Sequence, residues 1–413
     1  MNTANPLTLP LPLPLPPPAR RLLFSSFVLT VGRSVATPFL AIYLTRRMEL
    51  NQQQIGLILC AGLVLASLFG LYAGYLADRY DKRRLMRLAV VAMALLSLAI
   101  TWFDSALAVV LVLACTDAAA ALRSITLKAL LAELLPVAQR SRAFSVNYTL
   151  INLGYAIGPM LGGLVLGWGA AWPFYVSALL VMLTSQAMPR LQFSPVVRAD
   201  KDAAVASMAK PSFKTTLLLL KSDRRLLLFT IGSLLSALVY GRFVLYLSQY
   251  LIVSQGEQQA AALVPYLIMT NAIGVVLLQY PIGKFIRPDN LMRWIGLGSA
   301  MFVLGLLGFM HAASLPAWIC SMLLFTLGEV IVIPAEYLFI DSIAPATQKG
   351  SYYGVQNLAT LGDALSPLVC GALLMHAAPG AMFVALIAAA AGGAAMYYAG
   401  GRRRQLLPLR AEC

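Results

Sequence analysis

Charged side chains lie inside long apolar stretches of this sequence, where an ion is costly and needs a partner or a function. Glu329 and Glu336 are seven residues apart, so they share one face of a predicted helix, and Pro334 between them can loosen it. A carboxyl group buried there is expected to hold a proton at physiological pH, and at least one of the two is predicted to serve in proton coupling. The alternative is a permanent ion pair with Arg33 or Arg242.

Arg33 and Arg242 each lie halfway along an apolar stretch, at equivalent positions in the two halves of the chain. Because arginine keeps its charge in essentially any protein site, each of them needs an anion. A carboxylate of the chain meets that need as a structural pair, and so does the carboxylate or phosphate of a bound substrate. Tyr155 and Tyr337 are further candidates for substrate contact.

The intramembrane charges of the two signs balance, which favours internal pairing over exposure to lipid. The cations are Arg33, Arg123, Lys128 and Arg242, and the acids are Asp117, Glu329, Glu336 and Asp363. Asp363 and Asp117 are the second-choice proton sites. Asp341 lies near the end of its predicted helix and is expected to be solvated.

The composition requires a membrane around most of these elements. Of the 413 residues, 60% are apolar and 11% are charged, whereas a soluble chain carries about 25% charged residues. An all-α membrane protein in a lipid bilayer follows, with spans of about 20 residues each. Twelve spans are predicted, at 22–45, 55–77, 86–103, 106–131, 144–167, 170–188, 227–252, 260–283, 292–312, 315–340, 352–376 and 381–400.

The loops between the spans fix the predicted orientation. The net charge is +15, but the cations form short clusters between apolar runs, which argues against nucleic acid as a partner. Nearly all loop cations fall on one side, with only Arg46 and Arg47 on the other, so both termini are expected in the cytoplasm. The predicted segments are a Pro-rich segment 1–21, a six-helix bundle 22–188, a linker 189–226, a second six-helix bundle 227–400 and a basic tail 401–413. Within the linker, 212–225 is either a basic amphipathic helix on the membrane surface or a plain connector.

Enzyme and metal chemistry find no support in the sequence. The five cysteines are scattered through apolar runs without metal-ligand spacing. Catalytic patterns such as HExxH and GxSxG are also absent from it. We therefore expect no cofactor, no metal and no enzymatic activity.

The two halves of the chain repeat each other, most clearly at 153–160 and 361–368. Small residues recur every fourth position at Gly154, Gly158 and Gly162, which predicts a stripe where another helix backbone approaches closely. Parallel six-span repeats with a site between them are a transporter plan.

The loop after the second predicted span resembles a signature of the major facilitator superfamily. The residues that carry the resemblance are Gly74, Asp78, Arg79, Lys82 and Arg83, with Asp81 where the family has glycine. The resemblance implies that Asp78 latches onto the start of the eleventh span, near 349–353, and stabilises an outward-open state. The alternative is a cationic cluster that only sets topology.

The fifth span resembles the antiporter signature of the family's drug:proton branch, and the alternative there is ordinary helix packing. Its residues are Gly154, Gly158, Pro159, Gly162 and Gly163. The runs 32–44 and 328–337 resemble YdeE-type exporters of enterobacteria.

This resemblance implies a fold and a function. The fold is two pseudo-symmetric six-helix bundles, in a monomer of the bacterial inner membrane. The function is proton-coupled antiport by alternating access, with efflux of drugs, including multidrug efflux, or of dipeptides, and small-molecule substrates and protons as partners. Two alternatives stay open. One is an importer or exchanger of an organic anion held by Arg33 and Arg242, and the other is a receptor that transports nothing.

Overall fold

The computed structural model describes residues 15–48, 52–186 and 212–402, and within these ranges all regular structure is helical. Most of the Pro-rich segment, most of the linker and nearly all of the basic tail lie outside the described residues. The domain boundaries drawn through them therefore stay predictions.

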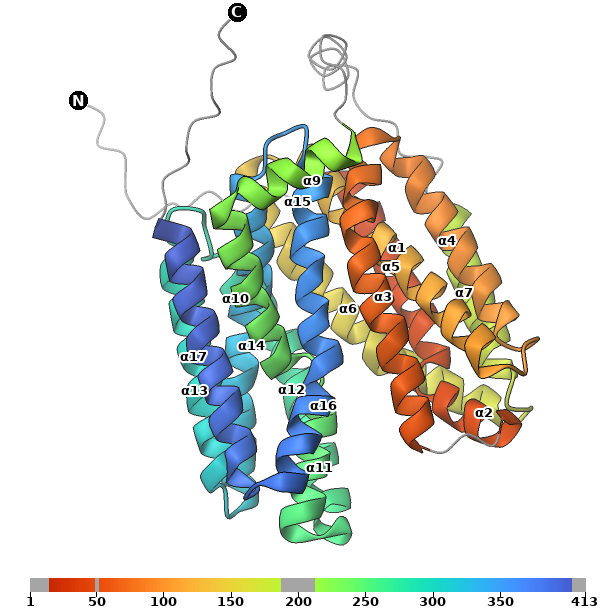
Figure 1. Cartoon of the computed structure of the whole chain (residues 1–413), viewed down its shortest axis with the longest axis vertical. Helices are drawn as coiled ribbons and strands as arrows, with labels where there is room; N and C mark the ends of the chain where they lie inside the picture. The colour runs from red at the N-terminus through yellow and green to blue at the C-terminus, as the bar shows by residue number, and fades with distance from the viewer. Residues whose placement is uncertain (1–14, 49–51, 187–211, 403–413) are drawn as a thin grey trace, which may run out of the picture.

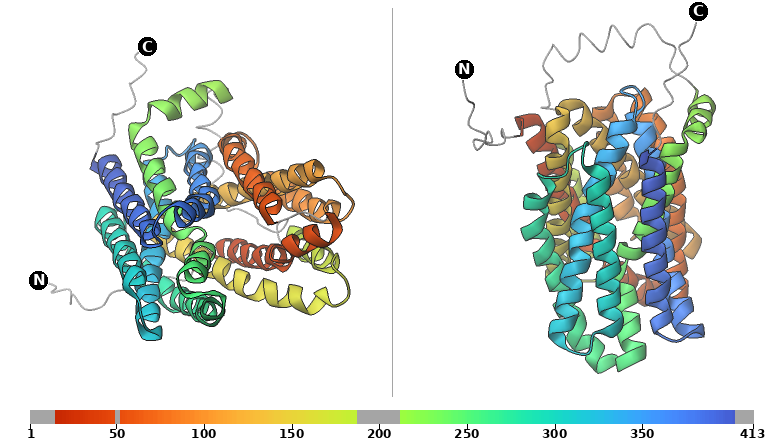
Figure 2. Two further views of the ribbon diagram at one scale, coloured as in Figure 1. Left: turned by 60° about the horizontal axis from the view of Figure 1, so that its bottom comes forward. Right: turned by 90° about the vertical axis from the view of Figure 1, so that its left-hand side faces the viewer.

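The helices of the first half pack on one another, with α1 against α6 and α7, and α5 against α3 and α4. They form one side of the molecule in Figures 1 and 2. Their bounds are α1 Pro17–Ala36, α2 Phe39–Met48, α3 Gln52–Arg79, α4 Lys82–Ala99, α5 Ala106–Leu134, α6 Val137–Leu166 and α7 Trp172–Gln186.

The second half forms the other side, with α14 against α12 and α13, and α10 against α16 and α17. Its helices are α9 Phe213–Ser222, α10 Arg224–Tyr240, α11 Phe243–Gln255, α12 Glu257–Gly283, α13 Leu291–His311, α14 Leu315–Ile343, α15 Lys349–Gln356, α16 Thr360–His376 and α17 Gly380–Arg402. A single 3-10 turn, η1 Asn357–Ala359, joins α15 to α16. Helix α9 lies within the predicted 212–225 segment, so this part of the linker is helical. Its place on the membrane surface stays a prediction.

Eight helices in the described ranges are long and apolar enough to cross a membrane, and the α10–α11 pair, bent by 45°, makes a ninth. The predicted spans 22–45, 86–103 and 170–188 correspond to α1 with α2, to α4 and to α7. All three are helical. The first is interrupted between α1 and α2, α4 carries cations in its first turn, and α7 is short. Pro159 and Pro334 lie inside α6 and α14, which continue through them.

The two halves meet through α3 against α15 and α16, and through α6 against α12 and α14. Helix α15 lies at the same end of the bundle as α9 and the last turn of α17 (Figure 1). The backbones approach very closely there, since a Cβ atom added to Gly350 would lie 2.6 Å from the carbonyl oxygen of Gly74. We call this end the closed end.

The glycine stripe of α6 lies against α1, as the spacing predicted. A Cβ atom on Gly154 would lie 2.8 Å from Cβ of Thr30, and one on Gly158 would lie 2.7 Å from the carbonyl oxygen of Val31. Ser34 of α1 also donates a hydrogen bond to the carbonyl oxygen of Gly154 at 2.8 Å. The stripe is therefore a helix contact in which any larger residue must displace backbone.

Replacing Gly158 with alanine is expected to cost about 1–3 kcal/mol of stability, because the added methyl group overpacks the α1–α6 contact. The matched control is Gly163→Ala, whose new Cβ would meet only the edge of Phe39 at 3.9 Å. Thermal unfolding of the purified protein measures both. Equal melting temperatures for the two variants would contradict the assigned contact.

Candidate functional site

Asp78, at the last turn of α3, binds the beginning of α15 across the two halves. Its two carboxylate oxygens accept hydrogen bonds from the backbone N–H groups of Gly350 and Ser351, each at 2.7 Å. The first N–H groups of a helix lack intrahelical partners and carry partial positive charge, so a carboxylate there is stabilised. The contact implied by the family resemblance is present.

The other residues of this loop make local contacts. Asp81 has φ −62° and caps α4 by accepting from the N–H of Arg84 at 2.9 Å, so the turn needs no glycine. Lys82 pairs with Glu133 at 3.0 Å and Arg83 with Asp81 at 3.6 Å. The first pair ties the start of α4 to the end of α5, and the second is local to the loop.

Asp341 joins the two halves next to this contact, which corrects the expectation that it is solvated. It is 3% exposed. Arg140 of α6 donates to it at 2.5 Å, and Lys349 at the start of α15 donates to its other carboxylate oxygen. One buried carboxylate thus holds two cations from opposite halves.

Arg33 and Arg242 differ in their partners. Arg33 pairs with Asp117 of α5 at 2.9 Å, with the two side chains 31% and 24% exposed. Within the described ranges, Arg242 has no carboxylate within 4 Å, although its charge acts on both Asp117 and Asp363. Asp363 lies beside Gly241, and its Oδ1 atom is buried without a hydrogen-bond partner in the described part of the chain. The structure therefore gathers these four charges in one region with a single close pair.

Glu329 is held by neutral groups from both halves. Its two carboxylate oxygens accept from the hydroxyl of Tyr148 on α6 and from the amide of Asn271 on α12, the latter at 2.7 Å. The predicted alternative of an ion pair with Arg33 or Arg242 is wrong for the described conformation.

Glu336 is held in the same way, entirely within the second half. It is 1% exposed. It accepts from the hydroxyl of Tyr397 on α17 and from the amide of Gln356 at 3.2 Å. Over the described residues, neither glutamate has a cation within 4 Å. Both are buried carboxyl groups to which a proton can be added without breaking an ion pair.

Two buried cations also lack carboxylate partners in the described ranges, which corrects the expected internal pairing. Arg123 is 4% exposed and donates to the hydroxyl of Ser26 at 3.0 Å. Lys128 lies over the ring of Tyr337, with Nζ 3.9 Å from the ring centroid. No local pattern in the sequence indicates this contact, because Lys128 lies on α5 and its aromatic partner on α14 of the other half.

Tyr155 and Tyr337, both predicted for substrate contact, are placed differently. Tyr155 is 53% exposed on α6. Tyr337 is partly buried between the halves under Lys128. In the part of the chain that is described, neither tyrosine forms a hydrogen bond to Arg33 or Arg242.

Known proteins match this fold over nearly the whole chain. The pattern of the Major Facilitator Superfamily matches residues 22–367. The MFS-type transporter YdeE of Escherichia coli K12 is 37% identical over 367 residues, 88% of this chain and 91% of the relative. The Na(+), Li(+), K(+)/H(+) antiporter of Planococcus maritimus is 23% identical, with 84% of this chain and 87% of its own covered. The structure of FucP in the outward conformation aligns with a TM-score of 0.72 at 16% identity, covering 93% of this chain and 98% of FucP.

The chain belongs to the major facilitator superfamily. It is therefore a multi-pass membrane transporter and not an enzyme, and the likeness to YdeE inferred from its motifs is confirmed.

Replacing Asp341 with asparagine is expected to destabilise the protein by about 3–5 kcal/mol, because Arg140 and Lys349 are left as buried cations without an anion. The matched control is Asp104→Asn, which removes an exposed pair with Arg47 worth about 0–1 kcal/mol. Chemical denaturation in detergent compares the two. A loss for Asp341→Asn no larger than the control's would show that the buried network contributes little.

Proposed function

We propose that the protein is a proton-coupled antiporter of the bacterial inner membrane that exports small amphipathic or zwitterionic compounds by alternating access. Its termini face the cytoplasm and it works as a monomer. In that orientation the closed end is cytoplasmic, so the described conformation is open outward, with Asp78 as the latch of the gate. The positive-inside pattern of the loops and the contacts of Asp78 support this proposal.

The observation that carries the proton coupling is the pair of glutamates held by neutral donors. Glu329 lies at the joint between the halves, where the hydroxyl of Tyr148 holds it. A hydroxyl binds an ionised carboxylate more strongly than a neutral one. Protonation of Glu329 therefore weakens this link between the halves and favours their separation at the closed end. Glu336 is a second candidate proton-binding site, in the second half, and Asp363 and Asp117 are further candidates.

Exchange of a proton for substrate needs this coupling. The protonated transporter opens inward, releases its proton to the cytoplasm and takes up substrate. The relative from Planococcus maritimus is named as an antiporter of Na(+), Li(+) and K(+) with H(+), and this name supports antiport here. Substrate export in everted vesicles, with dequenching of a ΔpH-sensitive dye as the readout, tests the whole proposal. A receptor would move nothing in this assay.

Replacing Glu329 or Glu336 with glutamine is expected to abolish accumulation of substrate against its gradient, while downhill exchange persists. The amide keeps the shape and one acceptor oxygen, and its NH2 group can donate to the neighbouring tyrosine hydroxyl, but it can neither gain nor lose a proton. Glu257→Gln is the matched control, because that glutamate is exposed at the start of α12. If both core variants still concentrate substrate in everted vesicles, the proton carrier is another acid, with Asp363 first.

A second candidate function is transport of a small organic anion held by Arg33 and Arg242. The observation that favours it is Arg242, which lies at the bend between α10 and α11 without a carboxylate within 4 Å among the described residues. A guanidinium in that state is stabilised by the carboxylate of a substrate, which it can bind through two hydrogen bonds. Arg33 is already paired with Asp117, so Arg242 is the primary anion ligand in this reading.

The change Arg242→Lys is expected to weaken binding of benzoate several-fold and to leave benzamide nearly unaffected, because lysine keeps the charge but loses the planar fork. Arg33→Lys is expected to act in the same direction. Arg287→Lys, on an exposed loop, is the control. Binding to the purified protein is measured by calorimetry. Equal weakening for both ligands would favour a structural role, and no weakening would remove the arginines from the site.

A further inference from the structure

Lys128 makes an unusual contact at the interface between the halves. It projects from α5 of the first half and is 7% exposed. Its ammonium lies 3.9 Å from the ring centroid of Tyr337 and 6.0 Å from that of Tyr353, both in the second half. Among the described residues it forms no hydrogen bond and no ion pair. The two rings, which we call the tyrosine pair, are therefore its direct partners.

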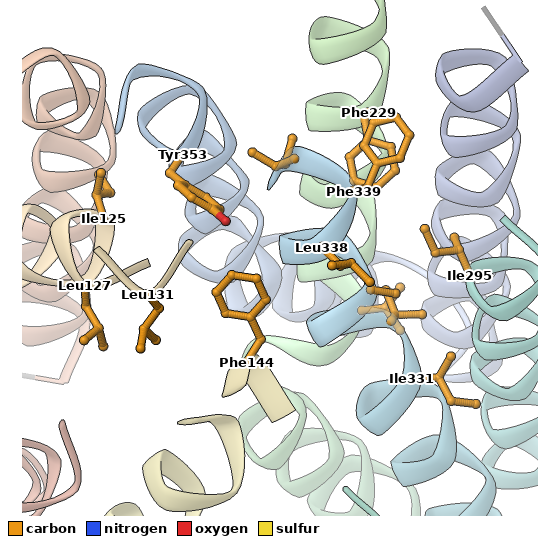
Figure 3. Close-up of a cluster of buried hydrophobic side chains, with 14 of the residues drawn as sticks. Ile125, Leu127, Leu131, Phe144, Phe229, Ile295, Ile331, Leu338, Phe339 and Tyr353 are labelled. Atoms are coloured by element: carbon orange, nitrogen blue, oxygen red, sulfur yellow. The ribbon is translucent and has the colours of Figure 1, made fainter. Parts of the chain in front are cut away.

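The tyrosine pair is well fixed. Tyr353 is fully buried and its hydroxyl donates to the carbonyl oxygen of Tyr337 at 3.4 Å. Phe144 of the first half packs edge-on against both, with ring centroids 6.0 and 6.4 Å away. Figure 3 shows Phe144 and Tyr353 pointing toward one another from α6 and α15. The rings thus form a rigid surface of negative electrostatic potential, which attracts cations.

A carboxyl group lies close to the same rings. Glu336 directly precedes Tyr337 on α14 and accepts a hydrogen bond at 3.2 Å from the amide of Gln356, which lies one turn after Tyr353 on α15. Glu336, Tyr337 and Tyr353 all belong to the second half. When the halves separate at the closed end, Lys128 and Phe144 leave with the first half. The tyrosine pair and Glu336 remain together, without their cation.

We propose that the tyrosine pair and Glu336 form a binding site for the ammonium group of a transported organic cation or zwitterion, and that Lys128 occupies this site while the closed end is shut. This inference rests on the alternating access in the proposed function. A lysine that served only as packing would bury an ammonium at a high desolvation cost, which a methionine avoids. A tethered cation that gives way to a substrate cation explains both its burial and its lack of a carboxylate partner.

The test uses benzyltrimethylammonium, whose charge is permanent, and its uncharged isostere neopentylbenzene. Equilibrium binding of each to the purified protein is measured in detergent without any gradient. Lys128→Gln removes the competing ammonium and is expected to raise the affinity for benzyltrimethylammonium by about tenfold, the scale of a desolvated cation–π contact. Neopentylbenzene is expected to bind the variant and the parent protein alike.

Further variants keep the test specific. In the Lys128→Gln background, Tyr337→Phe retains the ring and should keep the gain, whereas Tyr337→Leu should abolish it. The control is Lys284→Gln, an exposed lysine 4.9 Å from the ring of Phe285, which should change nothing. Lys128→Arg retains a cation and should show no gain in affinity for benzyltrimethylammonium. Because a gain in this variant would contradict the site, it keeps the proposal testable if the glutamine variant does not fold. An unchanged affinity in Lys128→Gln, an equal gain for neopentylbenzene, or a gain in Lys128→Arg would overturn the site.

The two proposals fail separately. Loss of proton-driven export in vesicles, with the predicted order of affinities intact, would refute the antiport function and leave the cation site. Export that works, with no difference in affinity between the variants, would refute the cation site alone.

Discussion

The backbone contact between α3 and α15 is the constraint on which the described conformation depends. Asp78 supplies two acceptors to N–H groups that have no partner within their own helix, and it reaches them because Gly74 and Gly350 carry no side chains. The bonds are made only when the two halves touch at this end. At the same joint, α5 of the first half packs against α15 of the second, and α6 packs against α14.

Those further contacts differ in chemistry, and this difference matters for a transporter. Asp341 holds Arg140 and Lys349 in a buried network of full charges. Glu329, by contrast, has one hydrogen-bond partner from the other half among the described residues, the hydroxyl of Tyr148. A proton changes the second kind of link far more readily than the first, because it needs no ion pair to break. A two-state equilibrium between closed and open ends responds to a ligand or proton only through such differences between the states.

The two halves share a backbone plan but not their charges. Arg33 and Arg242 occupy equivalent positions, yet only Arg33 has a carboxylate within 4 Å in the described part of the chain. Asp363 of α16 likewise stands where α6 carries Tyr155. The repeat therefore supplies two bundles with related backbones, whose side chains give them different arrangements of charge.

The sequence by itself determined the helices, their apolar lengths, the glycine stripe of α6 and the family, because each of these is written in local spacing. It also located Asp78 and its partner segment through a motif. It did not determine how the buried charges are paired. The numbers of intramembrane cations and acids are equal, but an ion pair depends on the distance between its two groups. The partners come from helices far apart in the chain. Only the tertiary structure decided that Asp341 is buried between two cations, and that Lys128 faces aromatic rings in place of a carboxylate. The physical reason is that burial and pairing are properties of the packed interface between the halves, which no single stretch of sequence contains.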